Sequence, residues 1–253
     1  MIAKILASIS LLFVLLPMAL FAQSDKAYIK YKEAELAPDP ESRKEAYNDA
    51  LNLYLQMESE APSAILLFNI ANTYFQLNEY GYAILYYYRA LKEDPRSDMI
   101  HNNLQIALKK AGLQEESPSF IQRYPLFIHY KLSHNEKAIT VLIFLFIVFA
   151  LLSVNLWLPQ LVLKKVAILF LSIAGILFLS LVWGDYLTTP EAIVVRSVAI
   201  RRDAGTQYAT IGNPALSGTK VEVLSVEKEG HWMRVRLPSG EEGYLSKEFA
   251  RII

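Results

Sequence analysis

The chain has 253 residues, 53% of them hydrophobic, and its 25 basic and 25 acidic residues give a formal net charge of +0. This balance disfavours a nucleic-acid partner, because domains that bind the phosphate backbone are usually basic. There is no cysteine, which excludes disulfides, thiol catalysis and cysteine-ligated metals. The apolar residues are concentrated in three runs, which indicates membrane segments and a multi-domain chain rather than one large core.

The N-terminal segment, residues 1–22, is predicted to be a signal peptide. Lys4 precedes an apolar run from Ile5 to Phe21, and this run is short for a membrane span of about 20 residues. We expect cleavage after Ala22, and an uncleaved N-terminal anchor is the alternative. The signal peptide predicts that the region after it is exported from the cytoplasm.

Residues 64–97 have the length and pattern of one tetratricopeptide repeat, a helix–turn–helix unit of ~34 residues. Small residues stand where the two helices would cross, at Ala71, Ala83 and Ala90. The large residues Tyr74 and Tyr87 stand beside them, and Pro95 closes the unit. The alternative is an ordinary amphipathic helical hairpin with a core of tyrosine and leucine.

Helical material is expected on both sides of this repeat, because a single repeat cannot bury its own faces. Ala50 and Tyr54 precede Ala83 and Tyr87 by the same number of residues, so residues 28–63 are predicted to form a degenerate first repeat. Residues 98–112 are predicted to be a helix that caps the stack. Together, residues 23–116 form the predicted α-helical tetratricopeptide region.

The first helices of successive repeats are expected to line a groove that binds a protein or peptide. The candidate groove residues are Ile65, Phe68, Asn72, Phe75, Met99, Asn102, Ile106 and Lys109. Asn72 follows Ala71, as an asparagine does in repeat domains that hold a peptide's C-terminal carboxylate. However, Phe68 stands where those domains carry a cation, so we expect an aromatic groove with little charge. The alternative is that Asn72 only tethers the neighbouring backbone.

Two uncharged runs, residues 138–158 and 166–184, are long enough to cross a hydrocarbon layer of ~30 Å as helices. A buried helical hairpin in a soluble core is the alternative. Residues 117–137 form the predicted juxtamembrane linker, whose aromatic side chains suit a membrane interface: Phe120, Tyr124, Phe127 and Tyr130.

The short connection between the two runs, residues 159–165, contains Lys164 and Lys165. Basic loops stay in the cytoplasm, so this loop is predicted to be cytoplasmic. The soluble regions before and after the two spans would then both be periplasmic. The chain is therefore predicted to be a two-pass protein of the bacterial inner membrane.

Residues 191–253 consist of short alternating segments separated by turns, a pattern typical of a small all-β barrel. The predicted strands lie at 193–195, 198–200, 220–226, 231–237, 243–245 and 250–253, and a polar loop is predicted at 205–214. The order of motifs, Leu-x-Gly-Thr-x-Val-x-Val-Leu, then Trp-x-x-Val, then Gly-x-x-Gly-Tyr-Leu, resembles a bacterial SH3-like barrel.

A surface for a ligand is expected on one face of this barrel. In the strand after His231, alternation directs Met233 and Val235 inward. The outward set is then Trp232, Arg234 and Arg236, with Tyr244 on the next strand. Exposed aromatic residues often anchor partners. The alternative is that Trp232 merely covers one end of the barrel. Gly243 is expected at a corner where a side chain would clash.

No catalytic or cofactor-binding motif accompanies these regions. His101, His129, His134 and His231 are scattered and lack metal-ligand spacing. Neither a P-loop nor a nucleophile-elbow motif is present. We therefore predict that the protein is not an enzyme and takes no cofactor or metal. A constellation assembled from residues distant in sequence is the alternative.

The order of signal peptide, tetratricopeptide region, two spans and SH3-like barrel resembles the BatE-like proteins of bacterial aerotolerance operons. The strings Asn72–Tyr74 and Ala83–Leu91 contribute to this resemblance. The resemblance implies a non-enzymatic component that works with von Willebrand A-domain membrane proteins and a MoxR-type ATPase in stress tolerance or envelope maintenance. The alternative function is a cell-wall sensor whose barrel binds peptidoglycan.

Overall fold

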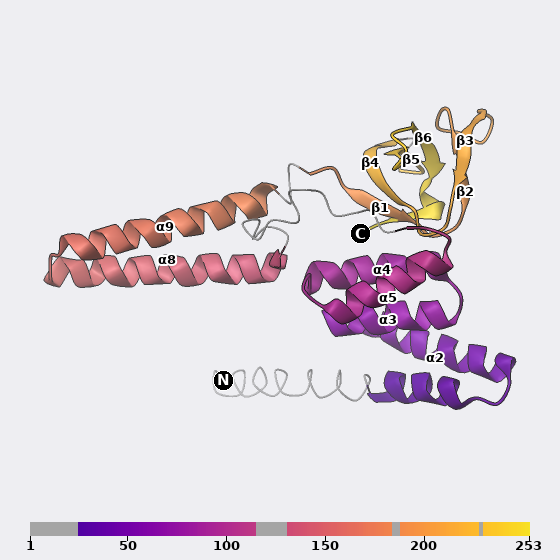
Figure 1. Cartoon of the computed structure of the whole chain (residues 1–253), viewed down its shortest axis with the longest axis horizontal. Helices are drawn as coiled ribbons and strands as arrows, with labels where there is room; N and C mark the ends of the chain where they lie inside the picture. The colour runs from indigo at the N-terminus through magenta and orange to yellow at the C-terminus, as the bar shows by residue number, and fades with distance from the viewer. Residues whose placement is uncertain (1–24, 115–130, 184–187, 228–229) are drawn as a thin grey trace, which may run out of the picture.

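The computed structural model describes residues 25–114, 131–183, 188–227 and 230–253. Figure 1 shows a helical region, a long two-helix hairpin that projects away from it, and a C-terminal sheet beside the helices. The predicted signal peptide and the four aromatic residues of the linker, Phe120, Tyr124, Phe127 and Tyr130, lie outside the described residues.

The helical region contains a helix at residues 25–36 followed by α2 (Pro40–Glu58), α3 (Ala64–Gln76), α4 (Tyr80–Glu93) and α5 (Asp98–Lys110). The helix starts follow local chemistry. The Asp39 carboxylate accepts hydrogen bonds from the first backbone N–H groups of α2, and Pro40 occupies the first helical position. Ser63 and Ser97 cap α3 and α5 in the same way. These side chains satisfy donors that have no partner inside the helix.

Helices α3 and α4 cross at the small residues that the sequence indicated. Ala71, Ala83 and Ala90 are fully buried, so the two helix backbones approach closely there. Tyr87 is 1% exposed and fills the space beside the crossing. The turn between the helices passes through Asn78, whose φ of 62° is in the left-handed region. Asparagine tolerates this conformation better than most residues.

We expect buried tyrosines to make the helical region sensitive to alkaline pH. Tyr54 is 2% exposed, and burial raises its pKa from 10.0 to about 12. A tyrosine whose folded pKa is raised favours its neutral form, so its contribution is complete below pH ~10 and is lost as the pH rises towards 12. The shift corresponds to about 2–3 kcal/mol. We expect circular dichroism to show a shallower alkaline loss of helix for Tyr54→Phe than for the natural chain. Coincident curves would contradict this.

Two long apolar helices follow, α8 (His134–Trp157) and α9 (Leu161–Val182), and both are long and apolar enough to cross a membrane. They pack along one narrow stripe, in which Phe144 and Phe170 meet edge to face at 5.3 Å. Most of their other side chains are exposed, which differs from the buried hairpin of a soluble core. The connection is shorter than predicted, because α9 begins at Leu161. Lys164 and Lys165 therefore lie in its first turns and not in a loop.

The start of α8 is attached to the helical region by polar contacts. Ser133 and Glu136 form a reciprocal capping box at its first turn. The Glu136 carboxylate also pairs with Arg96, which lies in the turn after α4. Asn135 Nδ2 donates to Glu93 Oε2 at 3.5 Å. The hairpin therefore leaves the helical region from the end of α4 (Figure 1).

The C-terminal region is one antiparallel sheet of seven strands. The strands are β1 (Glu191–Val194), β2 (Val198–Arg201), β3 (Thr210–Ala215), β4 (Lys220–Glu227), β5 (Trp232–Arg236), β6 (Glu242–Ser246) and β7 (Ala250–Ile252). Their order is β3-β2-β6-β5-β4-β1-β7. The edge strands β3 and β7 do not pair, so the sheet is open. The closed barrel predicted from the sequence is thus not formed by backbone pairing.

Strand β3 corrects the predicted polar loop at 205–214. Its residues include Gly212, Asn213 and Pro214, which sequence reasoning reads as loop formers. The strand is nevertheless possible because it lies at an edge and pairs only with β2, with an irregular register. A proline is tolerated on an edge strand, where its missing N–H faces away from the ladder. Edge position therefore overrides the local composition.

Candidate functional site

A pocket of about 210 Å³ lies on one face of the helical region. It is formed where residues 25–36, α3 and α5 lie next to one another, with α4 behind them. Its lining residues are Tyr31, Asn72, Phe75, Gln76, Tyr87, Asn103 and Ile106. Most lining side chains thus come from the first helix of each helix pair, and Tyr87 comes from the second helix α4.

A hydrogen-bond network at the floor of the pocket joins three helices. Tyr87 Oη of α4 donates to Asn72 Oδ1 of α3 at 2.6 Å. Asn103 Nδ2 of α5 donates to the same oxygen at 3.0 Å. Two donors converge on Oδ1, so this network sets the orientation of the Asn72 amide. Asn72 therefore tethers side chains of neighbouring helices, and not the neighbouring backbone that the alternative named.

The Asn72 amide nitrogen is accessible to solvent. Among the described residues, Nδ2 of this side chain donates no hydrogen bond, and no buried side-chain nitrogen or oxygen lacks a partner. Asn72 is half-buried and lines the pocket, so its two N–H donors are reached from the pocket. They suit an acceptor oxygen on a bound molecule.

The pocket carries no formal charge. None of its lining residues is acidic or basic, and burial raises the pKa of the Tyr87 hydroxyl well above its ordinary value. Its phenol is therefore neutral at physiological pH. Phe75, Ile106 and the ring of Tyr31 supply apolar surface around the amide groups. This arrangement can hold a neutral group by hydrogen bonding and apolar contact, but it offers no cation for a carboxylate.

The structure separates the predicted groove residues into three sets. Asn72, Phe75 and Ile106 line the pocket. Ile65, Met99, Asn102 and Lys109 are exposed but do not line it. Phe68 corrects the prediction, because it is 9% exposed and its ring packs 5.9 Å from that of Tyr87. It belongs to the core between α3 and α4.

Sequence reasoning missed four lining residues, Tyr31, Gln76, Tyr87 and Asn103. On α5 the predicted Ile106 lines the pocket, but Asn103 lines it in place of the predicted Asn102. The sequence predicts Tyr87 as a core residue. In the structure its side chain packs in the core and also lines the pocket. No local pattern marks Asn103, because its contact with Asn72 depends on how α5 stacks beside α3.

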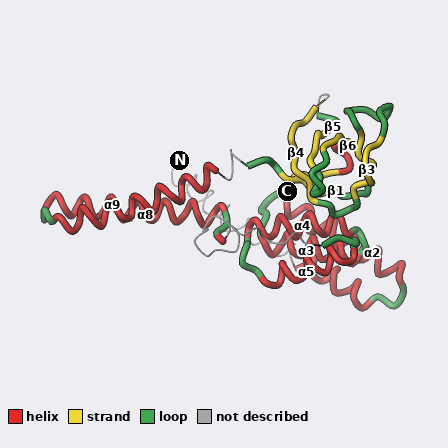
Figure 2. Tube along the Cα trace, turned by 45° about the horizontal axis from the view of Figure 1, so that its top comes forward, coloured by secondary structure: helices red, strands yellow, loops and turns green. Residues whose placement is uncertain are grey.

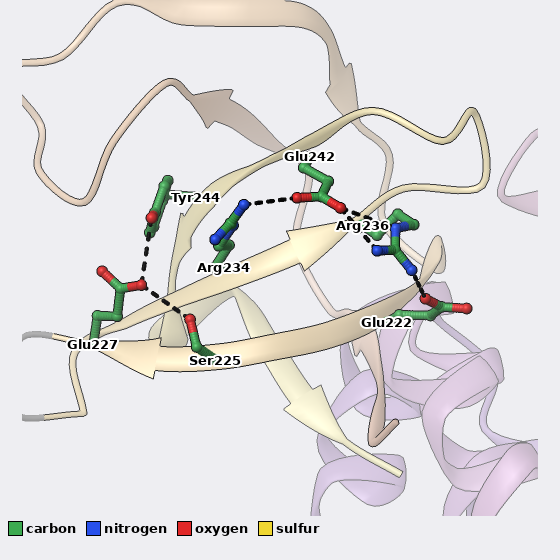
Figure 3. A network of polar contacts seen from close by, with 7 residues as sticks. All are labelled: Glu222, Ser225, Glu227, Arg234, Arg236, Glu242 and Tyr244. Carbon is green, nitrogen blue, oxygen red and sulfur yellow. Dashed lines mark hydrogen bonds and ion pairs between the residues drawn. The ribbon is translucent and has the colours of Figure 1, made fainter. Parts of the chain in front are cut away.

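The predicted surface on the sheet forms a network of ion pairs, shown in Figure 3. Arg234 pairs with Glu242 at 2.9 Å, and Arg236 pairs with both Glu242 and Glu222 at 2.8 Å. Hydrogen bonds from Arg236 hold the pKa of the Glu242 carboxyl below its usual value. These arginines therefore already have partners within the sheet, and a ligand would have to compete for them.

The aromatic residues of this surface differ in their setting. Tyr244 Oη contacts Glu227 Oε1 at 3.3 Å beside the arginines (Figure 3). Trp232 is half-buried and lies opposite Glu227 and Ser246 in the strand register. The four predicted residues thus come from the paired strands β5 and β6.

Within the described ranges, no group of histidine and acidic side chains is arranged to hold a metal ion.

One family model matches a part of this chain. Residues 64–97 match the tetratricopeptide repeat model, which covers α3, α4 and the turn after α4. No curated protein matches the chain. Tetratricopeptide repeats are typically non-catalytic modules for protein–protein interaction, so this match suggests an interaction scaffold. The match does not point to any enzyme family.

Proposed function

We propose that this protein is a non-enzymatic, membrane-bound scaffold whose helical groove binds a segment of another protein. The repeat match and the concave pocket support this function, because stacked helical repeats present their concave surfaces to partners. The observation that carries the proposal is the uncharged pocket floor, where Asn72 is oriented by Tyr87 and Asn103.

The pocket favours a neutral stretch of polypeptide over a free C-terminal carboxylate. A backbone carbonyl can accept from Asn72 Nδ2 while an apolar side chain packs near Phe75 and Ile106. A carboxylate would be desolvated there without a cation, which is costly. We therefore propose that the partner contributes an internal segment with at least one large apolar side chain.

The two apolar helices support membrane insertion. Exposed side chains along them include Phe146, Phe149 and Leu179, and an apolar surface of this extent needs a hydrophobic environment. We propose that residues 138–158 and 166–184 span the bacterial inner membrane, with Lys164 and Lys165 at the cytoplasmic end. The signal peptide at 1–22 and the linker at 117–137 complete a two-pass topology with both soluble regions in the periplasm.

The C-terminal region is proposed to be an SH3-like module that binds a second protein through Trp232, Arg234, Arg236 and Tyr244. The resemblance to BatE-like proteins implies von Willebrand A-domain membrane proteins and a MoxR-type ATPase as partners in an aerotolerance complex. Peptidoglycan is the alternative ligand of the same surface, as in a cell-wall sensor. Retention of the intact protein on purified peptidoglycan would favour that alternative.

Site-specific photo-cross-linking in cells tests the groove. A photoreactive residue at Ile106, which lines the pocket, is expected to capture a partner protein. The matched control is Lys110, which lies on the same helix but lines a different cleft. Phe68 is unsuitable because it is buried. Equal capture at Lys110, or none at Ile106 and Phe75, would contradict the proposal.

A further inference from the structure

The first strand of the sheet is buried against the repeat. Ile193 is 0% exposed and Val195, just after β1, is 1% exposed. Both belong to the same apolar cluster as Ile84 of α4. The sheet also has its own core, centred on residues such as Met233 and Val235. Strand β1 therefore serves two cores, because Ile193 belongs to the helical cluster and Val194 to the core of the sheet. Figures 1 and 2 show the sheet beside α4.

Two glycines allow the backbones of α4 and the sheet to approach closely. A Cβ atom at Gly81 of α4 would overlap Ser217 Oγ and the Val195 carbonyl, whose carbon would lie only 2.8 Å away. A Cβ atom at Gly218 would overlap Ile84 Cδ1 and lie 3.0 Å from Leu113 Cδ1. The overlap at Gly81 involves the Val195 backbone and cannot be relieved without moving α4 away from the sheet. The atoms near Gly218 are side-chain ends, and glycine is favoured there because its φ of 94° lies in the left-handed region.

Basic side chains of α4 cover the free side of edge strand β7. Arg89 Nη2 donates to the Ile252 carbonyl at 3.0 Å, and Lys92 Nζ donates to the Ile253 oxygen at 2.9 Å. An uncovered edge strand presents unpaired backbone groups that invite pairing with other chains. Lys220 of β4 also lies over the Tyr88 ring at 5.6 Å. Apolar, steric and polar contacts therefore all bring the sheet to one face of α4.

We propose that the C-terminal sheet docks on α4 and makes one rigid unit with the repeat, on the same side of the membrane, while the intervening chain crosses the membrane twice. The membrane crossing rests on the proposed function, whereas the docking contact rests on the residues of the interface. The docked sheet covers the face of α4 that carries Gly81 and Arg89. A partner of the repeat is then confined to the groove, which Tyr87 lines from the other face of α4.

Cysteine cross-linking of the full chain tests this arrangement, because the natural chain contains no cysteine. The test pair is Lys92→Cys with Ile253→Cys, treated with a short bis-maleimide in native membrane vesicles. Quantitative mass spectrometry is expected to find the intramolecular cross-link in most molecules. The matched control pair is Asp49→Cys with Ile253→Cys, since Asp49 lies on α2, which α3 and α4 separate from the sheet (Figure 1). That pair is expected to give little product.

Adding Gly81→Ala to the test pair is expected to remove most of the product, with the helical circular dichroism retained. Persistence of the product in that folded variant would overturn the proposed close approach. Absence of the cross-link both in vesicles and after detergent solubilisation would overturn docking and leave the proposed topology intact. A cross-link in detergent but not in vesicles would overturn the same-side arrangement and, with it, the two-pass topology.

Discussion

Replacing Tyr87 by alanine is expected to lower the free energy of unfolding of the helical region by about 3–5 kcal/mol, the range for truncating a buried aromatic side chain. The ring is 1% exposed and packs against Phe68. Its loss leaves a cavity between α3 and α4 and removes one of the two donors to Asn72. Urea unfolding of the full chain in detergent, followed by circular dichroism, measures the change.

Tyr87→Phe is the matched control, because it keeps the ring and removes only the hydroxyl. We expect a loss of about 1 kcal/mol, since Asn103 still donates to Asn72 Oδ1. The Asn72 amide is then less firmly oriented, so partner capture at Ile106 should fall more than stability does. Equal losses for the alanine and phenylalanine variants would show that the ring does not support the core as described.

Replacing Gly243 by valine is expected to detach the β2–β3 hairpin from the sheet and destabilise the module by about 1–3 kcal/mol or more. A Cβ atom at this position would overlap Ile200 Cγ2 and lie 2.8 Å from Ile211 Cδ1 and 2.9 Å from the Arg201 carbonyl oxygen. Strand β6 meets β2 at this point through Arg201 and Tyr244, so the side chain would wedge the two strands apart.

Hydrogen exchange of the full chain measures this effect, with faster exchange expected in β2 and β3 than in β4 and β5. The matched control is Thr210→Val, which places the same side chain at an exposed position on β3 and is expected to change stability by less than about 0.5 kcal/mol. Unchanged protection of β2 in Gly243→Val would contradict the prediction.

Helix positions were predictable from the sequence because their signals are local. Asp39, Ser63 and Ser97 begin helices through bonds to residues two or three positions away, and the small residues of the crossing recur at repeat spacing. The roles of Phe68 and Asn103 were not predictable in this way. Both lie near the border between core and groove, where the way that neighbouring helices stack decides which side a residue faces.

The sheet likewise has features that the local sequence predicts and features that depend on packing. Its alternating strands are readable, with Met233 and Val235 buried and Arg234 exposed between them. By contrast, the composition of β3 predicts a loop, since Gly212 and Pro214 are poor strand formers and only an edge position accommodates them. The partners of Arg234 and Arg236 were likewise unpredictable, because Glu222 and Glu242 come from the strands on either side of β5.

The repeat, the two apolar helices and the β character of the C-terminal region follow from the amino-acid sequence, because spacing, capping and run length act within one helix, one span or one strand. Which faces of these elements remain open depends on how they pack together. Gly81 lies close to Ser217, and Arg89 donates a hydrogen bond to Ile252. The two-helix hairpin separates the members of each pair along the sequence, so these contacts leave no local pattern. Close packing of β1 on α4 therefore covers one face of this helix, and the proposed groove lies on the other.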